Sequence, residues 1–338
     1  MPLGDRTLYD LSMPEEFVQI GNDAAGTSRL LPIADLIESL HGGKCRRPQD
    51  LTTLFDIPET DWIRVQTELA GAHRAARKRE SDVGTRHREL NRELRELAFG
   101  FPPYSTENDL DLIQKHMGPP LRQRELESAL QDLVLRPATR ARMLVGRFEK
   151  LVPFDQFAYV IDSAYFAYCR GNVVASFMCI LPVIEGVIVR WAEDVGGNLG
   201  KGFPGYADWV SDTPVRAPLL ANPLFADSYA ETCGHILSAH LYKKTQEDLA
   251  FGLFNRHIAL HLKEERGFAT PQNLVRAFLL LDLMSELLIC ERWDRDPMFH
   301  VTPEEEGTLR DAYQQAAISQ LTPPTPENAL FRHKEYRF

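Results

Sequence analysis

This chain of 338 residues lacks the cysteine pattern of a metal-binding or disulfide-linked scaffold. Its five cysteines are scattered and include no CxxC pair; they are Cys45, Cys169, Cys179, Cys233 and Cys290. A small zinc module or a secreted disulfide framework needs closely spaced cysteines. The sequence therefore argues against both classes, and free thiols in a reducing compartment are the simplest interpretation.

Long apolar runs are also missing. No uninterrupted apolar stretch reaches about 18 residues, the length that a membrane-spanning helix needs. The first residues, from Met1 to Asp5, lack the basic segment followed by an apolar one that marks a secretory signal. We therefore expect a cytoplasmic protein with no membrane partner.

Positive charge is in deficit, because 38 Lys and Arg face 48 Asp and Glu, a formal net charge of −10. Nonspecific coating of nucleic acid depends on basic side chains that attract phosphate, so this balance argues against such a protein. Residues 61–150 differ, with 17 basic against 14 acidic side chains. A long charged helix is predicted at about 60–98. Its Arg and Glu spacing indicates a solvated face, and an RNA-backbone contact surface is the alternative.

Strand-type alternation, internal repeats and low-complexity blocks are absent as well, so the expected fold class is all-α. Three parts are predicted: a helical N-terminal region of unknown role (1–150), a helical bundle (151–295), and a C-terminal helix with a tail (296–338). The boundary follows a break at Leu151-Val152-Pro153, after which apolar runs lengthen and charges become fewer. A Gly/Pro-rich segment at 196–223 is expected to be a long excursion from the bundle.

Helix starts are the clearest local signals. Thr270 and Pro271 predict an N-cap and a first helical residue, and apolar side chains then recur every three or four positions from Leu274 to Leu288. The run that opens with Thr302-Pro303 places three glutamates at the positive end of another helix. Other helices are expected to begin near 105–108 and to cover about 154–165, 173–188, 227–242 and 246–263.

One stretch of seven residues, Asn255 to His261, concentrates polar groups in an apolar setting. On a helix, His257 and His261 share a face, and Arg256 lies about 100° round from His257. An Arg followed five positions later by a His is expected about once by chance in a chain of this composition. The pattern occurs twice, but the second copy, Arg295 to His300, has a proline in the middle that would disrupt a helix.

Three interpretations of this stretch are open. A metal site would need a third ligand beside the two histidines, and HxxxH without an internal Glu is a weak motif. In a structural role, His261 would be a core histidine bonded to a carbonyl, and Arg256 would be a buried ion-pair partner, for instance of Glu185. In a catalytic role, an imidazole would take the proton of a ribose 2′-hydroxyl while the arginine holds the phosphate. The last chemistry needs no metal and no cofactor.

The string from Arg256 to His261 resembles the motif of HEPN domains, in which an Arg and a polar residue are followed by three residues and a His. These domains are all-helical nucleic-acid-processing modules of toxin-antitoxin, abortive-infection and antiviral systems. Similarity extends over about 155–292 and includes the segment 181–186 with Glu185, and Thr270, Asn273 and Arg276 in the leucine-rich helix region. Leu262 departs from the subgroup, which commonly has Gly there.

The resemblance implies a bundle of four or five helices and a homodimer in which two motifs form one composite site. Arg256 and His261 would be the catalytic pair, His257 the polar residue beside the arginine, and Glu185 a residue that orients or charge-balances the site. The hypothesis is a metal-independent endoribonuclease of toxin or phage-defence type, with RNA as substrate and 1–150 serving regulation, sensing or a partner protein. The alternative is a catalytically inactive HEPN-like dimerisation and binding scaffold.

Overall fold

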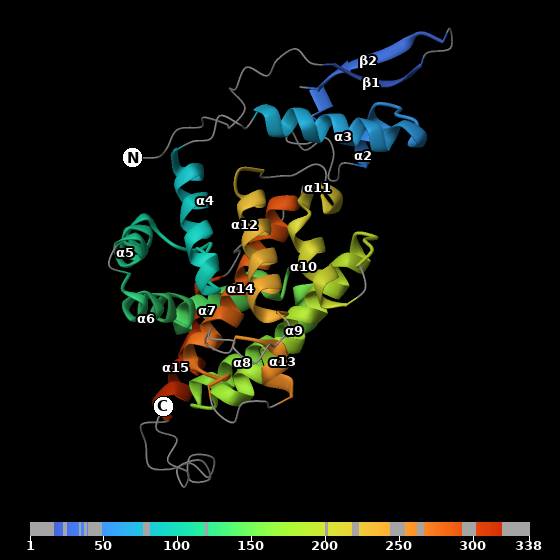
Figure 1. Cartoon of the computed structure of the whole chain (residues 1–338). Coiled ribbons are helices and arrows are strands. Elements are labelled where there is room, and N and C mark those ends of the chain that lie inside the picture. Colours follow the sequence, from blue (N-terminus) through green and yellow to red (C-terminus); the bar gives the residue numbers. More distant parts are fainter. Residues whose placement is uncertain are drawn as a thin grey trace. The chain divides into compact units, whose positions relative to one another are not determined.

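The computed structural model describes residues 17–22, 26–33, 35–36, 39, 49–76, 82–118, 121–199, 202–217, 223–243, 254–261, 267–292 and 302–319. Helices dominate these residues, which confirms the all-α class (Figure 1). The elements are β1 (Phe17–Asn22), β2 (Ser28–Pro32), α2 (Asp50–Leu54), α3 (Glu59–Ala76), α4 (Asp82–Leu94), η1 (Arg95–Leu97), α5 (Glu107–Met117), α6 (Gln123–Val134), α7 (Pro137–Met143), η2 (Leu144–Phe148), η3 (Phe154–Phe157), α8 (Ala158–Cys169), α9 (Val173–Asp194), α10 (Phe203–Ser211), α11 (Thr213–Arg216), α12 (Pro223–His235), η4 (Ile236–Leu241), α13 (Arg256–Leu260), α14 (Pro271–Glu291) and α15 (Pro303–Ile318).

The chain divides into two compact units. Unit 1 contains Met1–Arg88, Asp212–Ala230 and Leu287–Asp296, and unit 2 contains the segments Glu89–Ser211, Glu231–Glu286 and Pro297–Phe338. The boundary expected near residue 151 lies inside unit 2, where the break at 151–153 is a turn before η3. The whole candidate motif belongs to unit 2.

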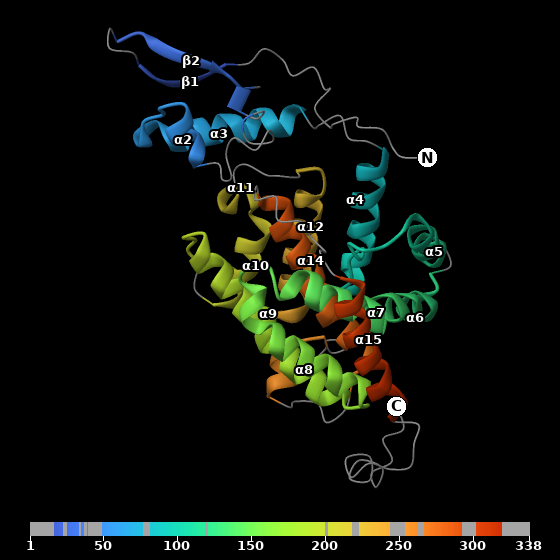
Figure 2. The ribbon, with the colours of Figure 1, turned by 180° about the vertical axis from the view of Figure 1, so that it is seen from behind.

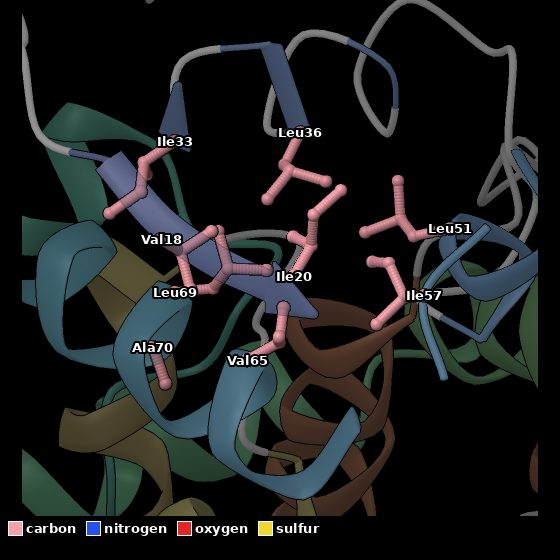
Figure 3. Close-up of a cluster of buried hydrophobic side chains, with 9 residues drawn as sticks. All are labelled: Val18, Ile20, Ile33, Leu36, Leu51, Ile57, Val65, Leu69 and Ala70. Atoms are coloured by element: carbon pink, nitrogen blue, oxygen red, sulfur yellow. The ribbon is translucent and has the colours of Figure 1, made fainter. Parts of the chain in front are cut away.

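A β-hairpin in unit 1 shows that the expected absence of strands was wrong for residues 17–32. β1 pairs antiparallel with β2, with Val18 opposite Leu31. Val18 and Ile20 are buried while Phe17 is exposed, and this short alternation is the only strand signal in the segment. Two strands alone are marginally stable in water, so the hairpin depends on the apolar core that it shares with α3. Figure 3 shows that core: Val18, Ile20, Ile33, Leu36, Leu51, Ile57, Val65, Leu69 and Ala70.

Two long apolar helices, α8 and α9, pack along each other in unit 2 (Figure 2). They correspond to the helices expected at 154–165 and 173–188, and α9 continues through Pro182. Among the described residues, α9 alone is long and apolar enough to cross a membrane by length and composition. Ten residues of α9, from Ser176 to Ala192, are buried inside the protein.

The Gly/Pro-rich segment at 196–223 contains regular structure that the sequence analysis did not predict. Residues 203–211 form α10 and residues 213–216 form α11. Trp209 is buried and meets Trp191 of α9 edge to face, with ring centroids 5.2 Å apart. Aromatic packing between Trp209 and Trp191 therefore holds α10 against α9.

The two best-marked helix starts are confirmed. Thr270 accepts a hydrogen bond from the Asn273 amide at 3.1 Å, and α14 begins at Pro271. Thr302 forms a capping box with Glu305 at the start of α15. α14 is buried on every side over most of its length, so its polar side chains need partners inside the protein.

Several predictions fall on residues outside the described ones. These are most of the helix expected at 246–263, the second Arg and His pair at 295–300, the tail after residue 319, and the positions Cys45 and Leu262. The charged helix expected at 60–98 is described as α3, α4 and η1, without residues 77–81.

Candidate functional site

The candidate motif forms a short helix, α13, whose start is fixed by Asn255. The Asn255 side chain accepts hydrogen bonds from the amides of His257 at 2.9 Å and Ile258 at 3.2 Å. Such a cap satisfies amides that have no partner within the helix. Ile258 and Ala259 are buried, whereas Leu260 and His261 are exposed, so α13 anchors one face and presents the other to solvent.

Arg256 forms a two-pronged ion pair with Glu185 of α9. Its Nε bonds to Oε1 of Glu185, and its Nη2 bonds to Oε2 at 3.2 Å. The two side chains keep 22% and 21% of their surface exposed. The pairing suggested from the lone glutamate in an apolar run is therefore present, although the pair is half-buried rather than fully enclosed.

The Glu185 carboxylate occupies only one edge of the Arg256 guanidinium. A guanidinium has five N–H donors in a plane, and two of its edges can bind an oxyanion with two parallel bonds. Within the part of the chain that the structure describes, Nη1 of Arg256 makes no hydrogen bond or ion pair. The edge formed by Nη1 and Nη2 thus keeps donors that a second anion can use.

Three aromatic residues of α10 and the end of η4 form a group that contacts this ion pair through Phe203. The guanidinium carbon of Arg256 lies 4.3 Å from the centroid of the Phe203 ring. Phe203 stacks on Tyr242 with centroids 4.8 Å apart, and Tyr206 meets both rings edge to face. A cation over an aromatic face is attracted by the ring quadrupole, so the Phe203 ring favours this position of the guanidinium.

The enclosed hydroxyl of Tyr242 lies near the Arg256 and Glu185 ion pair. Burial is the main cause that raises its pKa well above 10, and the negative charge of Glu185 adds to the effect while Arg256 opposes it. Among the described residues, the hydroxyl has no hydrogen-bond partner. Tyr242 therefore stays neutral and acts here through its ring and its uncharged O–H group.

The two imidazoles of α13 lie side by side. The ring centroids of His257 and His261 are 4.4 Å apart, and His261 is exposed at the C-terminal end of the helix. The interpretation of His261 as a core histidine was therefore wrong. A histidine bonded to a carbonyl is found instead at His240, which is half-buried; its Nε2 lies 3.0 Å from the carbonyl of Arg95, and its pKa is lowered mainly by burial.

Gly186, the neighbour of Glu185, is closely packed. A Cβ atom at Gly186 would lie 2.6 Å from the Phe157 ring, which is closer than such atoms approach. Glycine at this position lets the Phe157 ring of η3 lie directly against the backbone of α9, one residue from Glu185.

The described residues contain no group of three or more His, Cys, Asp or Glu side chains arranged to hold a metal ion. The structure brings together Arg256 with Glu185, and His257 with His261, from the four residues that the sequence singled out. Phe203, Tyr206 and Tyr242 were not predicted to belong to the site. The first two are three residues apart in Phe-Pro-Gly-Tyr, a spacing that places them on one helix face, but no signal marked Tyr242.

Comparisons of this chain with protein-family models, with curated proteins and with solved structures found no match. The resemblance to HEPN domains therefore remains a hypothesis that rests on the residues of the motif and on their arrangement.

Proposed function

We propose that this protein is a metal-independent endoribonuclease of HEPN type that acts in toxin or phage-defence systems. The observation that carries the proposal is the partly exposed Arg256 side chain, which is paired with Glu185 and, among the described residues, keeps one guanidinium edge unbonded, on the same short helix as two adjacent imidazoles. This arrangement offers an anion-binding group and acid or base groups within six residues.

The chemistry that fits these groups is transfer of a phosphate ester to the neighbouring 2′-oxygen. The free edge of Arg256 binds the non-bridging phosphate oxygens, and it stabilises the negative charge that builds up in the transition state. The His261 imidazole takes the proton of the 2′-hydroxyl as the general base. The 2′-oxygen attacks phosphorus and the bond from phosphorus to the 5′-oxygen breaks. The 5′-oxygen then takes up a proton from solvent.

The products are a 2′,3′-cyclic phosphate and a free 5′-hydroxyl, and DNA is spared because it lacks the attacking group. In this proposal Glu185 and Phe203 orient the guanidinium, and His257 is the polar neighbour of Arg256. The protein works as a cytoplasmic homodimer, in which α13 of each protomer contributes to one composite site. Residues 1–150 regulate it or bind a partner protein.

The test is cleavage of total RNA and tRNA by the purified full chain in EDTA, for the parent, Arg256→Ala and His261→Ala. We expect each variant to lose about a hundredfold or more in rate, the typical cost of removing a transition-state donor or a general base. Products of the parent should carry cyclic phosphates, and an RNA with 2′-O-methyl groups should resist cleavage.

Arg190→Ala is the matched control, because Arg190 lies on α9 and its exposed ion pair with Glu193 is unrelated to α13. It should cut RNA at the parent rate. A parent that leaves RNA intact, or an Arg256→Ala variant that cuts as fast as the Arg190→Ala control, would overturn the nuclease proposal.

A second candidate function is a catalytically inactive HEPN-like scaffold. The observation that favours it is the enclosure of Arg256 between Glu185 and Phe203, which is also how a purely structural arginine is held. In a scaffold, Arg256→Ala would weaken the bundle or its self-association, and no RNA would be cut by any variant. Sedimentation of the parent and the variant at several concentrations measures that effect.

A further inference from the structure

The Asn255 side chain connects two structural elements as well as capping one. Its Nδ2 donates hydrogen bonds to the carbonyl oxygens of His240 at 3.2 Å and Lys243 at 2.7 Å. These carbonyls lie at the end of the π-helix η4, where backbone acceptors have no partner in the next turn. The side-chain amide of Asn255 therefore ends η4 and begins α13 with one group, and we call this set of bonds the Asn255 joint.

The orientation of this amide is fixed by its partners. Two carbonyls can only accept and two backbone amides can only donate, so the Nδ2 and Oδ1 positions cannot be exchanged. Asn255 is 4% exposed, and water does not replace these bonds easily. A residue that lacks either the donors or the acceptor would leave buried backbone groups without partners.

The next residue along the chain meets the same turn through its side chain. The Arg256 guanidinium lies over Phe203, and Phe203 stacks on Tyr242, which stands between the two carbonyls of the joint in the sequence. The backbone of α13 and the side chain of Arg256 are thus both positioned against residues 240–243.

We propose that Asn255 is a positioning residue that holds α13 so that the free edge of Arg256 and the His257 and His261 imidazoles face one substrate phosphate. The proposal rests on the ribonuclease function proposed above, but its geometric part can be measured without any cleavage. Misplacement of catalytic groups by about 1 Å can cost about a hundredfold in rate.

Asn255→Asp isolates this role. Aspartate is as good an N-cap as asparagine, so α13 keeps its start. Its second oxygen would face the carbonyls of His240 and Lys243 without a proton to donate, which breaks the joint. We expect kcat on RNA to fall by about tenfold to a hundredfold with little change in KM, because the groups are misplaced rather than removed.

The matched control is Asn172→Asp. Asn172 caps α9 by accepting the amide of Ala175 at 3.0 Å, and its substitution makes the same chemical change at a cap away from α13. It should leave kcat and KM within twofold of the parent. The second readout is the NMR signals of histidine labelled with ¹³C at Cε1, with those of His257 and His261 assigned by single substitutions.

We expect the two imidazole signals to shift in Asn255→Asp and to stay in place in Asn172→Asp. A folded Asn255→Asp protein with parental imidazole signals and parental kcat would overturn the proposal. If the parent does not cut RNA, the nuclease function fails, and the NMR comparison alone decides on the joint. If Asn255→Asp does not fold by circular dichroism, Asn255→Ser, which keeps a capping oxygen and lacks the donors, decides by the same readouts.

Discussion

Two arginine pairs of unit 2 use the same chemistry in opposite settings. Arg140 binds Asp282 of α14 through both terminal nitrogens, at 3.0 and 2.5 Å, and it also meets the Tyr104 hydroxyl; the ion-paired side chains are 2% and 0% exposed. Arg256 and Glu185 keep 22% and 21% of their surface. In a fully enclosed pair each charge depends on the other, and no donor is accessible to a ligand. A partly exposed pair with an unbonded guanidinium edge can also bind a ligand.

The largest effect should come from breaking the buried pair. Arg140→Leu leaves the Asp282 carboxylate in the core without its directly bonded cation; the Tyr104 hydroxyl still donates to it, and Arg147 acts on it only electrostatically. We expect a loss of about 3–5 kcal/mol in the free energy of unfolding, the typical cost of stranding a buried charge. Arg256→Leu should cost about 1 kcal/mol or less, because solvent reaches that pair. Urea unfolding followed by circular dichroism measures both, and equal losses would remove the distinction between the two pairs.

A buried imidazole in unit 1 extends the comparison between enclosed and partly exposed polar groups. His87 is enclosed by aromatic rings. Its ring meets Phe225 and Tyr229 with centroids 4.8 and 5.0 Å away. Burial, with a smaller contribution from Arg88, lowers the pKa of His87 from 6.5 to about 4. Between pH 6.5 and about 4, the imidazole is therefore protonated in the unfolded chain but neutral in the folded one. The contribution of His87 to the free energy of unfolding is fully present above pH 6.5, and it falls by about 3 kcal/mol as the pH drops to about 4.

His87→Phe keeps an aromatic ring in that place and removes the titration. Unfolding by urea at a series of pH values between 4 and 7 should show a shallower decline for the variant than for the parent. The same slope in both proteins would contradict the assignment to His87.

Exchanging the charges of the Arg256 and Glu185 pair distinguishes its effect on stability from its effect on RNA cleavage. Arg256→Glu alone places two carboxylates together and should destabilise the protein by about 1 kcal/mol. Adding Glu185→Arg restores opposite charges and should recover most of that loss. RNA cleavage should not return, because the guanidinium then extends from α9 instead of α13. If the double variant recovers both stability and RNA cleavage, then cleavage needs the ion pair but does not need the guanidinium on α13, and the prediction is wrong.

The smallest effect should come from the aromatic contact. Phe203→Leu keeps an apolar side chain but removes the ring beneath the Arg256 guanidinium. We expect a loss of about 0.5–1 kcal/mol, the usual strength of a cation over a ring at a partly exposed site. Thermal unfolding of the variant and the parent measures it, and Phe166→Leu, which removes another ring near an arginine, is the matched control. A loss above about 3 kcal/mol would show that Phe203 is mainly a core residue.

Features that depend on neighbouring residues could be predicted from the sequence. Thr270 and Thr302 begin helices because their side chains bond to amides within three residues, and that signal is local. The hairpin at 17–32 could not be separated from coil, because only Val18 and Ile20 alternate before Gly21 ends the pattern.

Some features of the candidate site could likewise be predicted from the sequence, and others could not. The Arg256 and Glu185 pairing spans 71 positions and could be suggested, since an isolated acidic residue in an apolar run needs a buried partner. The roles of His240 and His261 could not be distinguished, because exposure depends on packing and not on residue type. Phe203 and Tyr242 join the site through contacts between separate elements, for which the chain carries no periodic signal.

The contact of Gly186 with the Phe157 ring has a consequence for tracing relatives of this chain. A side chain at position 186 would overlap the present position of the Phe157 ring, so the ring would have to move. Relatives that keep an aromatic ring at position 157 beside the Arg256 pair should therefore keep the dipeptide Glu-Gly even where the surrounding apolar residues vary freely. Searching for Glu-Gly in an apolar helix, about 70 residues before an Asn-Arg-His string, is a more selective criterion than the Arg and His spacing alone.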